Sequence, residues 1–61
     1  MDHYTVKRLA LIMAVQAEIE GMKVVNAYCI LLGEKPQYKE SDFVDKAMDL
    51  RSLAYAHDEQ L

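Results

Sequence analysis

The sequence has little cysteine, glycine or proline, and it has no tryptophan. Its 61 residues include one Cys, two Gly and one Pro. One Cys excludes an internal disulfide, and with only two His the chain has no Cys/His cluster for a structural zinc ion. A chain of this length buries only about 60% of the surface that its unfolded form exposes, which leaves little net stability. We therefore expect self-association, so the first expected partner is another copy of the chain.

Composition and charge exclude several classes of protein. Hydrophobic residues make up 52% of the chain, and the scarcity of Gly and Pro excludes a disordered tail. The net charge of −3 argues against long nucleic acid as a partner. Charges at Glu18, Glu20 and Lys23 interrupt the apolar run well short of the roughly 20 residues of a membrane span, so no membrane partner is expected. The lone Cys29 suits a reducing compartment, and we expect a cytoplasmic protein.

A long first helix is expected over residues 4–32. This segment contains one Gly and no Pro, and it is dominated by Leu, Ala, Met, Glu, Lys and Ile, which favour helices. Gly33 follows as a residue that can turn left-handed after the last helical position. Pro36 then prevents the helix from resuming. The first helix should therefore end near Leu32, before a polar loop.

A shorter second helix is expected over residues 42–57. Ser41 is a candidate N-cap, and Asp42 and Asp45 in the first turn suit the positive end of the helix dipole. The core stripe that we predict for this helix consists of Phe43, Ala47, Leu50 and Ala54. The chain is thus predicted to be all-α, with one domain over residues 1–61. That domain is a two-helix antiparallel hairpin that assembles into a homo-oligomeric helical bundle.

The unequal helix lengths predict an uncovered segment. At about 1.5 Å per residue, the first helix spans roughly 43 Å and the second roughly 24 Å. We expect the second helix to cover the half of the first helix nearest the loop, and to leave residues 4–15 without a partner inside the chain. An exposed apolar segment of this size usually contacts another chain. The predicted oligomer interface comprises Leu9, Ala10, Leu11, Ile12, Met13, Ala14, Val15, Ala17 and Gly21.

The first helix is apolar on two sides. One side carries a 3-4 spaced series formed by Ile12, Val15, Ile19, Met22 and Cys29. The roughly opposite side carries Ala10, Met13, Ala17, Val24, Tyr28 and Leu31. A ridge of small residues that would let a second backbone approach closely is formed by Ala10, Ala14, Ala17 and Gly21. A helix with two apolar sides must be buried on both, which again indicates a second chain.

Polar residues at apolar positions are candidates for binding. Arg8 and Asn26 lie on the side of the first helix that contains Met22. Asn26 either sets the register of a helix interface or contacts a ligand. Arg8 either lays its apolar stem over the interface and keeps its charged head in water, or contacts a ligand.

Tyr38 lies in the polar loop between Lys35 and Lys39. An exposed aromatic ring flanked by cations can stack on a base while the cations neutralise phosphate. The alternative is a ring that folds down and plugs the open end of the hairpin.

Catalytic and metal sites are not expected. The sequence has no Gly-rich phosphate loop and no evident pairing of a nucleophile with a base, so we expect no enzyme. Asp42, Asp45 and Asp49 follow helical spacing without a His or Glu partner, which is typical of a solvated face rather than a metal site. Binding, and not catalysis, is therefore the expected activity.

Parts of the chain resemble small phage-encoded helical-hairpin proteins. Tyr38-x4-Phe43 followed by residues 47–54 (AMDLRSLA) resembles the C-terminal helix of the anti-CBASS and anti-Thoeris cyclic-nucleotide sponges. Residues 18–26 (EIEGMKVVN), together with Gly33 and Tyr38, are similar to short phage proteins. The sponges carry a Trp before the second helix, and Tyr38 would take its place here.

The resemblance implies an anti-defence protein of the host cytoplasm, whose oligomer holds a nucleotide messenger between protomers without cleaving it. The expected ligand is a cyclic nucleotide or an ADP-ribose-type molecule, and no cofactor is expected. Basic side chains would pair with phosphates, Tyr38 or Tyr4 would stack on a base, and Asn26 would read a base edge or ribose. The candidate ligand-binding residues are Lys23, Asn26, Tyr38, Lys35, Lys39, Arg8, Lys7 and Tyr4.

Two other functions stay open at this point. In one, Asp42, Asp45 and Asp49 dock on a basic surface of a host defence nuclease or regulator and inhibit it. In the other, the chain is a structural oligomer without a ligand. Changing the three Asp to Asn would abolish the first function and leave sequestration intact. Lys23→Ala or Tyr38→Ala would instead impair sequestration.

Overall fold

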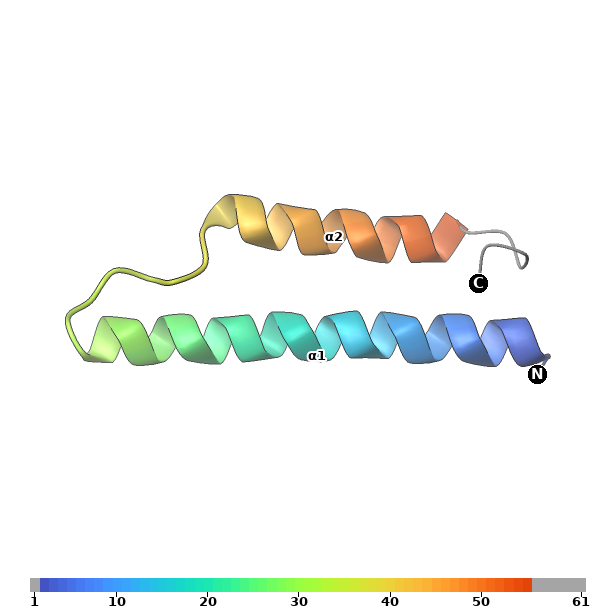
Figure 1. The fold of residues 1–61 in the computed structure, drawn as a ribbon, viewed down its shortest axis with the longest axis horizontal. Coiled ribbons are helices and arrows are strands. Elements are labelled where there is room, and N and C mark those ends of the chain that lie inside the picture. Colours follow the sequence, from blue (N-terminus) through green and yellow to red (C-terminus); the bar gives the residue numbers. More distant parts are fainter. Residues whose placement is uncertain (1, 56–61) are drawn as a thin grey trace.

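The computed structural model describes residues 2–55, which form two antiparallel helices joined by a loop (Figure 1). α1 comprises His3–Leu31 and α2 comprises Glu40–Tyr55. Both described helices and the absence of strands in this range confirm the all-α hairpin. Neither helix in this part of the chain is long and apolar enough to cross a membrane. The expected extension of the second helix to residue 57 lies outside the described residues.

The C-terminal end of α1 is fixed by a glycine. The backbone N–H of Gly33 donates a 3.0 Å hydrogen bond to the carbonyl of Ile30, and the N–H of Glu34 donates one of 2.9 Å to the carbonyl of Cys29. With a φ of 75° at Gly33, these bonds form a Schellman motif. The prediction that the first helix ends near Leu32, before Gly33, is confirmed, since α1 ends at Leu31.

Aspartate side chains accept hydrogen bonds from the backbone at both helix N-termini. Asp2 is the N-cap of α1 and accepts a 2.8 Å hydrogen bond from the backbone N–H of Thr5. At α2, Asp42 accepts a 2.8 Å hydrogen bond from the backbone N–H of Lys39. The Lys39 carbonyl in turn accepts a 3.0 Å bond from the N–H of Asp42, so Lys39 occupies the cap position. The prediction that Ser41 caps this helix is wrong, because the helix begins before Ser41.

One side of α1 packs against α2. Met22 is the one buried side chain among the described residues, with 6% of its surface exposed. The half-buried residues around it define what we call the inner seam of α1: Arg8, Ile12, Val15, Ile19, Asn26 and Cys29. The half-buried residues that α2 contributes include Phe43, Lys46, Leu50 and Leu53.

The predicted core stripe of α2 is correct in part. Phe43 and Leu50 are half-buried, but Ala47 and Ala54 are exposed. The reason is that the 3-4 spacing from Phe43 passes through Lys46 and not through Ala47. A coiled pair of helices keeps that spacing in contact with its partner.

α2 lies further from the hairpin tip than the helix lengths suggest. It runs beside the middle and N-terminal turns of α1, while the loop over residues 32–39 returns along the C-terminal turns (Figure 1). Asn26 hydrogen-bonds Tyr38, and Glu18 pairs with Lys46, which fixes this register. The last described turn of α2 is therefore beside the first third of α1.

This register corrects the expectation that residues 4–15 have no partner inside the chain. Ile12 and Val15 belong to the inner seam and are half-buried against α2. The error arises because the loop is not a tight turn: its extended residues, at about 3.3 Å each, carry the chain back along α1 before α2 begins. The other residues of the predicted oligomer interface are exposed in the single chain: Leu9, Ala10, Leu11, Met13, Ala14, Ala17 and Gly21.

No part of residues 2–55 covers the second apolar side of α1. Val24, Tyr28 and Leu31 are 68%, 63% and 84% exposed. The chain exposes 4905 Å² in all, whereas a compact folded monomer of 7.0 kDa exposes about 4,000 Å². Its radius of gyration is 14.6 Å, against about 10.5 Å for a compact domain of this length. The hairpin is therefore long and thin, and it buries only one of the two apolar sides of α1.

Candidate functional site

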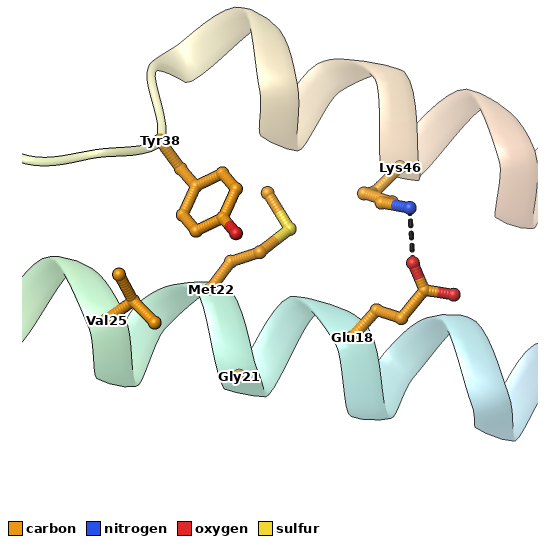
Figure 2. A pocket seen from close by; sticks show the side chains of 6 residues that line it. All are labelled: Glu18, Gly21, Met22, Val25, Tyr38 and Lys46. Carbon is orange, nitrogen blue, oxygen red and sulfur yellow. Dashed lines mark hydrogen bonds and ion pairs between the residues drawn. The ribbon is translucent and has the colours of Figure 1, made fainter.

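A hollow of about 380 Å³ lies between the middle of α1 and the start of α2 (Figure 2). The residues that line it are Glu18, Gly21, Met22, Val25, Tyr38 and Lys46. Glu18, Met22 and Val25 lie three or four residues apart, so successive turns of α1 present them on one face, which Gly21 flanks. Pockets for small ligands measure about 300–1,000 Å³, so the volume suits a small molecule.

Asn26 fixes the loop at one end of this hollow. Its Nδ2 donates a 3.0 Å hydrogen bond to the backbone carbonyl of Tyr38, and its Oδ1 accepts a 2.9 Å bond from the Tyr38 N–H. The two bonds satisfy the main-chain polar groups of a half-buried loop residue. The arrangement agrees with the interpretation of Asn26 as a register-setting residue.

The Tyr38 ring folds from the loop toward α1 and lies near Met22 and Val25 (Figure 2). The residue is half-buried. This position agrees with the interpretation in which the ring plugs the open end of the hairpin. It also makes the ring one wall of the hollow, next to an apolar surface.

An ion pair closes the other end of the hollow. Nζ of Lys46 lies 2.5 Å from Oε2 of Glu18, and the two side chains are 28% and 55% exposed (Figure 2). The hydrogen bond to Glu18 raises the pKa of Lys46 above its ordinary value of 10.5. Lys46 thus lays its stem over the inner seam while Glu18 compensates its charge.

Lys46 is the site residue that the sequence analysis missed. The signal that could have found it is the 3-4 spacing of α2, in which Lys46 falls between Phe43 and Leu50. A lysine at an apolar position between two helices needs an acidic partner, because its charge is partly removed from water. Glu18 on α1 is that partner.

The predicted ligand-binding residues form two groups in a single chain. Tyr4, Lys7 and Arg8 lie in the first turns of α1, and Arg8 is about 27 Å along the helix axis from Asn26. Asn26 and Tyr38 are brought together by the hydrogen bonds described above. One small ligand on one protomer cannot contact both groups.

The predicted lysines are solvent-exposed and do not line the hollow. Lys23 pairs with Glu20 at 3.1 Å on an exposed part of α1, where such a pair adds little stability. Lys7, Lys35 and Lys39 are also exposed. The cation at the hollow is therefore Lys46 and not one of the lysines that the sequence analysis selected.

The acidic residues of α2 do not form a single exposed stripe. Asp42 is half-buried and its carboxylate accepts the hydrogen bond from Lys39, whereas Asp45 and Asp49 are exposed. Within residues 2–55 there is no group of three or more His, Cys, Asp or Glu side chains that could hold a metal ion. Of the three Asp residues predicted to dock on a basic protein, only Asp45 and Asp49 are therefore exposed for such a contact.

No family model, no curated protein and no solved structure matches the chain significantly.

Proposed function

We propose that the protein is a non-catalytic helical-hairpin module that works as a homo-oligomer. The observation that supports this proposal is the exposed apolar side of α1, with Val24, Tyr28 and Leu31 each more than half exposed. Apolar surface removed from water contributes about 25 cal/mol per Å², and exposed patches of this kind mark contacts with other chains. Helices packed on one side only also depend on further tertiary contacts for their stability.

Sedimentation velocity of two matched variants tests the proposal. Val24→Glu places a charge on the exposed side of α1, and we expect it to reduce the assembly to the 7.0 kDa monomer, because the charge would have to be desolvated on association. Val44→Glu is the control, since Val44 is 49% exposed on α2. The proposal fails if the two variants sediment alike or if the unmodified chain is monomeric at high micromolar concentration.

A second candidate function is the sequestration of a small anionic nucleotide. The hollow supports it, because the Tyr38 ring and the neighbouring Met22 provide a surface for a base while Lys46 provides a cation. Phosphate would replace Glu18 as the partner of Lys46. The resemblance to phage sponges selects cyclic nucleotides and ADP-ribose-type molecules as the ligands, and a role against host defence in the cytoplasm as the context.

Calorimetric titration with cyclic di- and trinucleotides and ADP-ribose derivatives tests this second candidate. Glu18→Gln removes the competing carboxylate and should tighten binding, whereas Lys46→Met should weaken it. Lys23→Ala is the matched control, because Lys23 does not line the hollow. If neither the unmodified chain nor Glu18→Gln releases or absorbs heat with any of these ligands, the sequestration hypothesis is wrong. That result would not affect the proposed homo-oligomer.

A further inference from the structure

We propose that the outward side of α1 pairs with the same side of a second copy, antiparallel and around a two-fold axis near residues 22 and 23. This inference rests on the proposed homo-oligomer and names its interface. The side in question carries an unbroken 3-4 spaced series, which we call the outward seam: Ala10, Ala14, Ala17, Gly21, Val24, Tyr28 and Leu31. Every member is exposed and none is charged.

The size of the side chains along the outward seam selects the antiparallel arrangement. The first four positions are Ala or Gly, and the last three are Val24, Tyr28 and Leu31. In an antiparallel pair, the small half of one copy faces the large half of the other. In an in-register parallel pair each position would face its own copy, which would crowd the large residues and leave gaps between the small ones.

One antiparallel register places a small residue opposite each large one. In it, Gly21 faces Val24 of the second copy. Ala17 faces Tyr28, and Ala14 faces Leu31, and the two-fold axis repeats each pairing. Facing layers that alternate large and small residues are those that interdigitate without voids. Ala10 then lies beyond the last helical residue of the second copy and takes no part in the contact.

Gly21 lies between the hollow and the outward seam, and no neighbour among the described residues requires a glycine there, whereas this contact does. A Cβ at Gly21 would meet no atom within 4 Å in the hairpin. Glycine in the middle of a helix costs about 1 kcal/mol relative to alanine. Opposite Val24 of a second copy, and next to the two-fold axis, the missing side chain lets the two α1 backbones approach closely.

The exposed area is sufficient for one such partner. The chain exposes 4905 Å², which exceeds the value for a compact monomer of its mass by about 900 Å². Each partner in a standard protein–protein interface buries about 800 Å². The excess is thus comparable to the area that one further copy would bury.

Disulfide cross-linking tests the register. In a Cys29→Ser background, the double variant Ala17→Cys/Tyr28→Cys should form a covalent dimer on mild oxidation. The two positions face each other between copies, whereas within one helix they are about 16 Å apart and a disulfide needs Cα atoms within about 7 Å. The single variants Ala17→Cys and Tyr28→Cys are the controls and should stay monomeric on a denaturing gel. Cross-linking of the single variants would overturn the antiparallel arrangement.

A matched pair of alanines provides a second readout. Ala17→Leu would place two large side chains opposite each other and should weaken the dimer at least about tenfold in sedimentation. Ala10→Leu should leave the dimer unchanged. Both alanines are exposed in the hairpin, so the helix content of each variant should match that of the parent. If the unmodified chain dimerises and the two substitutions change its dimerisation equally, this register is wrong but the homo-oligomer stands. If the unmodified chain is monomeric, both the register and the proposed homo-oligomer are wrong.

Discussion

The side-chain amide of Asn26 holds the backbone of Tyr38 through two hydrogen bonds, of 3.0 and 2.9 Å. These bonds join the inner seam of α1 to the loop residue that directly precedes Lys39, the cap of α2. Because Tyr38 is held at this point, α2 begins two residues later, and Lys46 then lies within reach of Glu18. The Asn26 side chain and the Lys46–Glu18 pair thus fix the register of the two helices together.

Asn26→Ala is expected to destabilise the hairpin by about 1–2 kcal/mol, because the N–H and carbonyl of Tyr38 lose their partners at a half-buried position. Urea unfolding followed by circular dichroism measures the change. Gln16→Ala on the exposed part of α1 is the control, with an expected change below about 0.5 kcal/mol. The same unfolding midpoint for both variants would contradict a register-setting role for Asn26.

The two glycines are expected to respond in opposite directions when changed to alanine. Gly33→Ala should cost about 1–2 kcal/mol, because the φ of 75° is strained for a residue with a Cβ. Gly21→Ala should stabilise the monomer by about 1 kcal/mol, since the site is open and helical. Both are measured in the Val24→Glu background, so that dimerisation does not contribute. Destabilisation by Gly21→Ala in that background would mean that the hairpin itself requires this glycine.

Met22→Ala is expected to cost about 2–4 kcal/mol, because Met22 is 6% exposed and is the one buried side chain among the described residues. Met48→Ala, at a methionine that is 55% exposed on α2, should change the free energy of unfolding by less than about 0.5 kcal/mol. Met22→Leu conserves volume and should cost less than about 1.5 kcal/mol, which keeps the comparison measurable if Met22→Ala does not fold. Similar losses for Met22→Ala and Met48→Ala would show that α2 packs elsewhere.

The pair between Lys46 and Glu18 predicts a pH dependence at the alkaline end. The pKa of Lys46 is raised above 10.5 by its hydrogen bond to Glu18, so the pair stabilises the folded chain fully below pH 10.5. That contribution is lost as the pH rises through the folded-state pKa. The unfolding midpoint should therefore fall less steeply above pH 10.5 in Glu18→Gln than in the unmodified chain. Other groups that titrate in this range are common to both proteins, so parallel curves would contradict the coupling.

Much of the fold follows from local signals in the sequence. Gly33 and Pro36 predict the end of α1, because a left-handed glycine and a helix-breaking proline act through their own backbone. The 3-4 spacing around Met22 predicts which side of α1 faces α2. These features depend on residues that are close together in the chain, and the structure agrees with them.

The path of the loop and the composition of the hollow depend on contacts between distant residues. Asn26 and Tyr38 are joined by tertiary hydrogen bonds that move α2 back along α1, and no local pattern encodes that shift. Residue preference alone predicts Ser41 as the N-cap of α2. In the structure Lys39 is the N-cap, and the Asp42 carboxylate accepts the hydrogen bond from its N–H. The basic residues predicted to bind a ligand follow from their charge, which does not indicate where a side chain lies relative to a hollow.

Whether α1 requires a second copy is decided by the molar mass of the unmodified chain, measured by light scattering over a series of concentrations. We expect a mass of twice the 7.0 kDa of one chain at high concentration, decreasing toward 7.0 kDa on dilution as the helix content falls. A fully helical protein with a mass of 7.0 kDa at every concentration would contradict the proposal that the outward seam is covered by a partner.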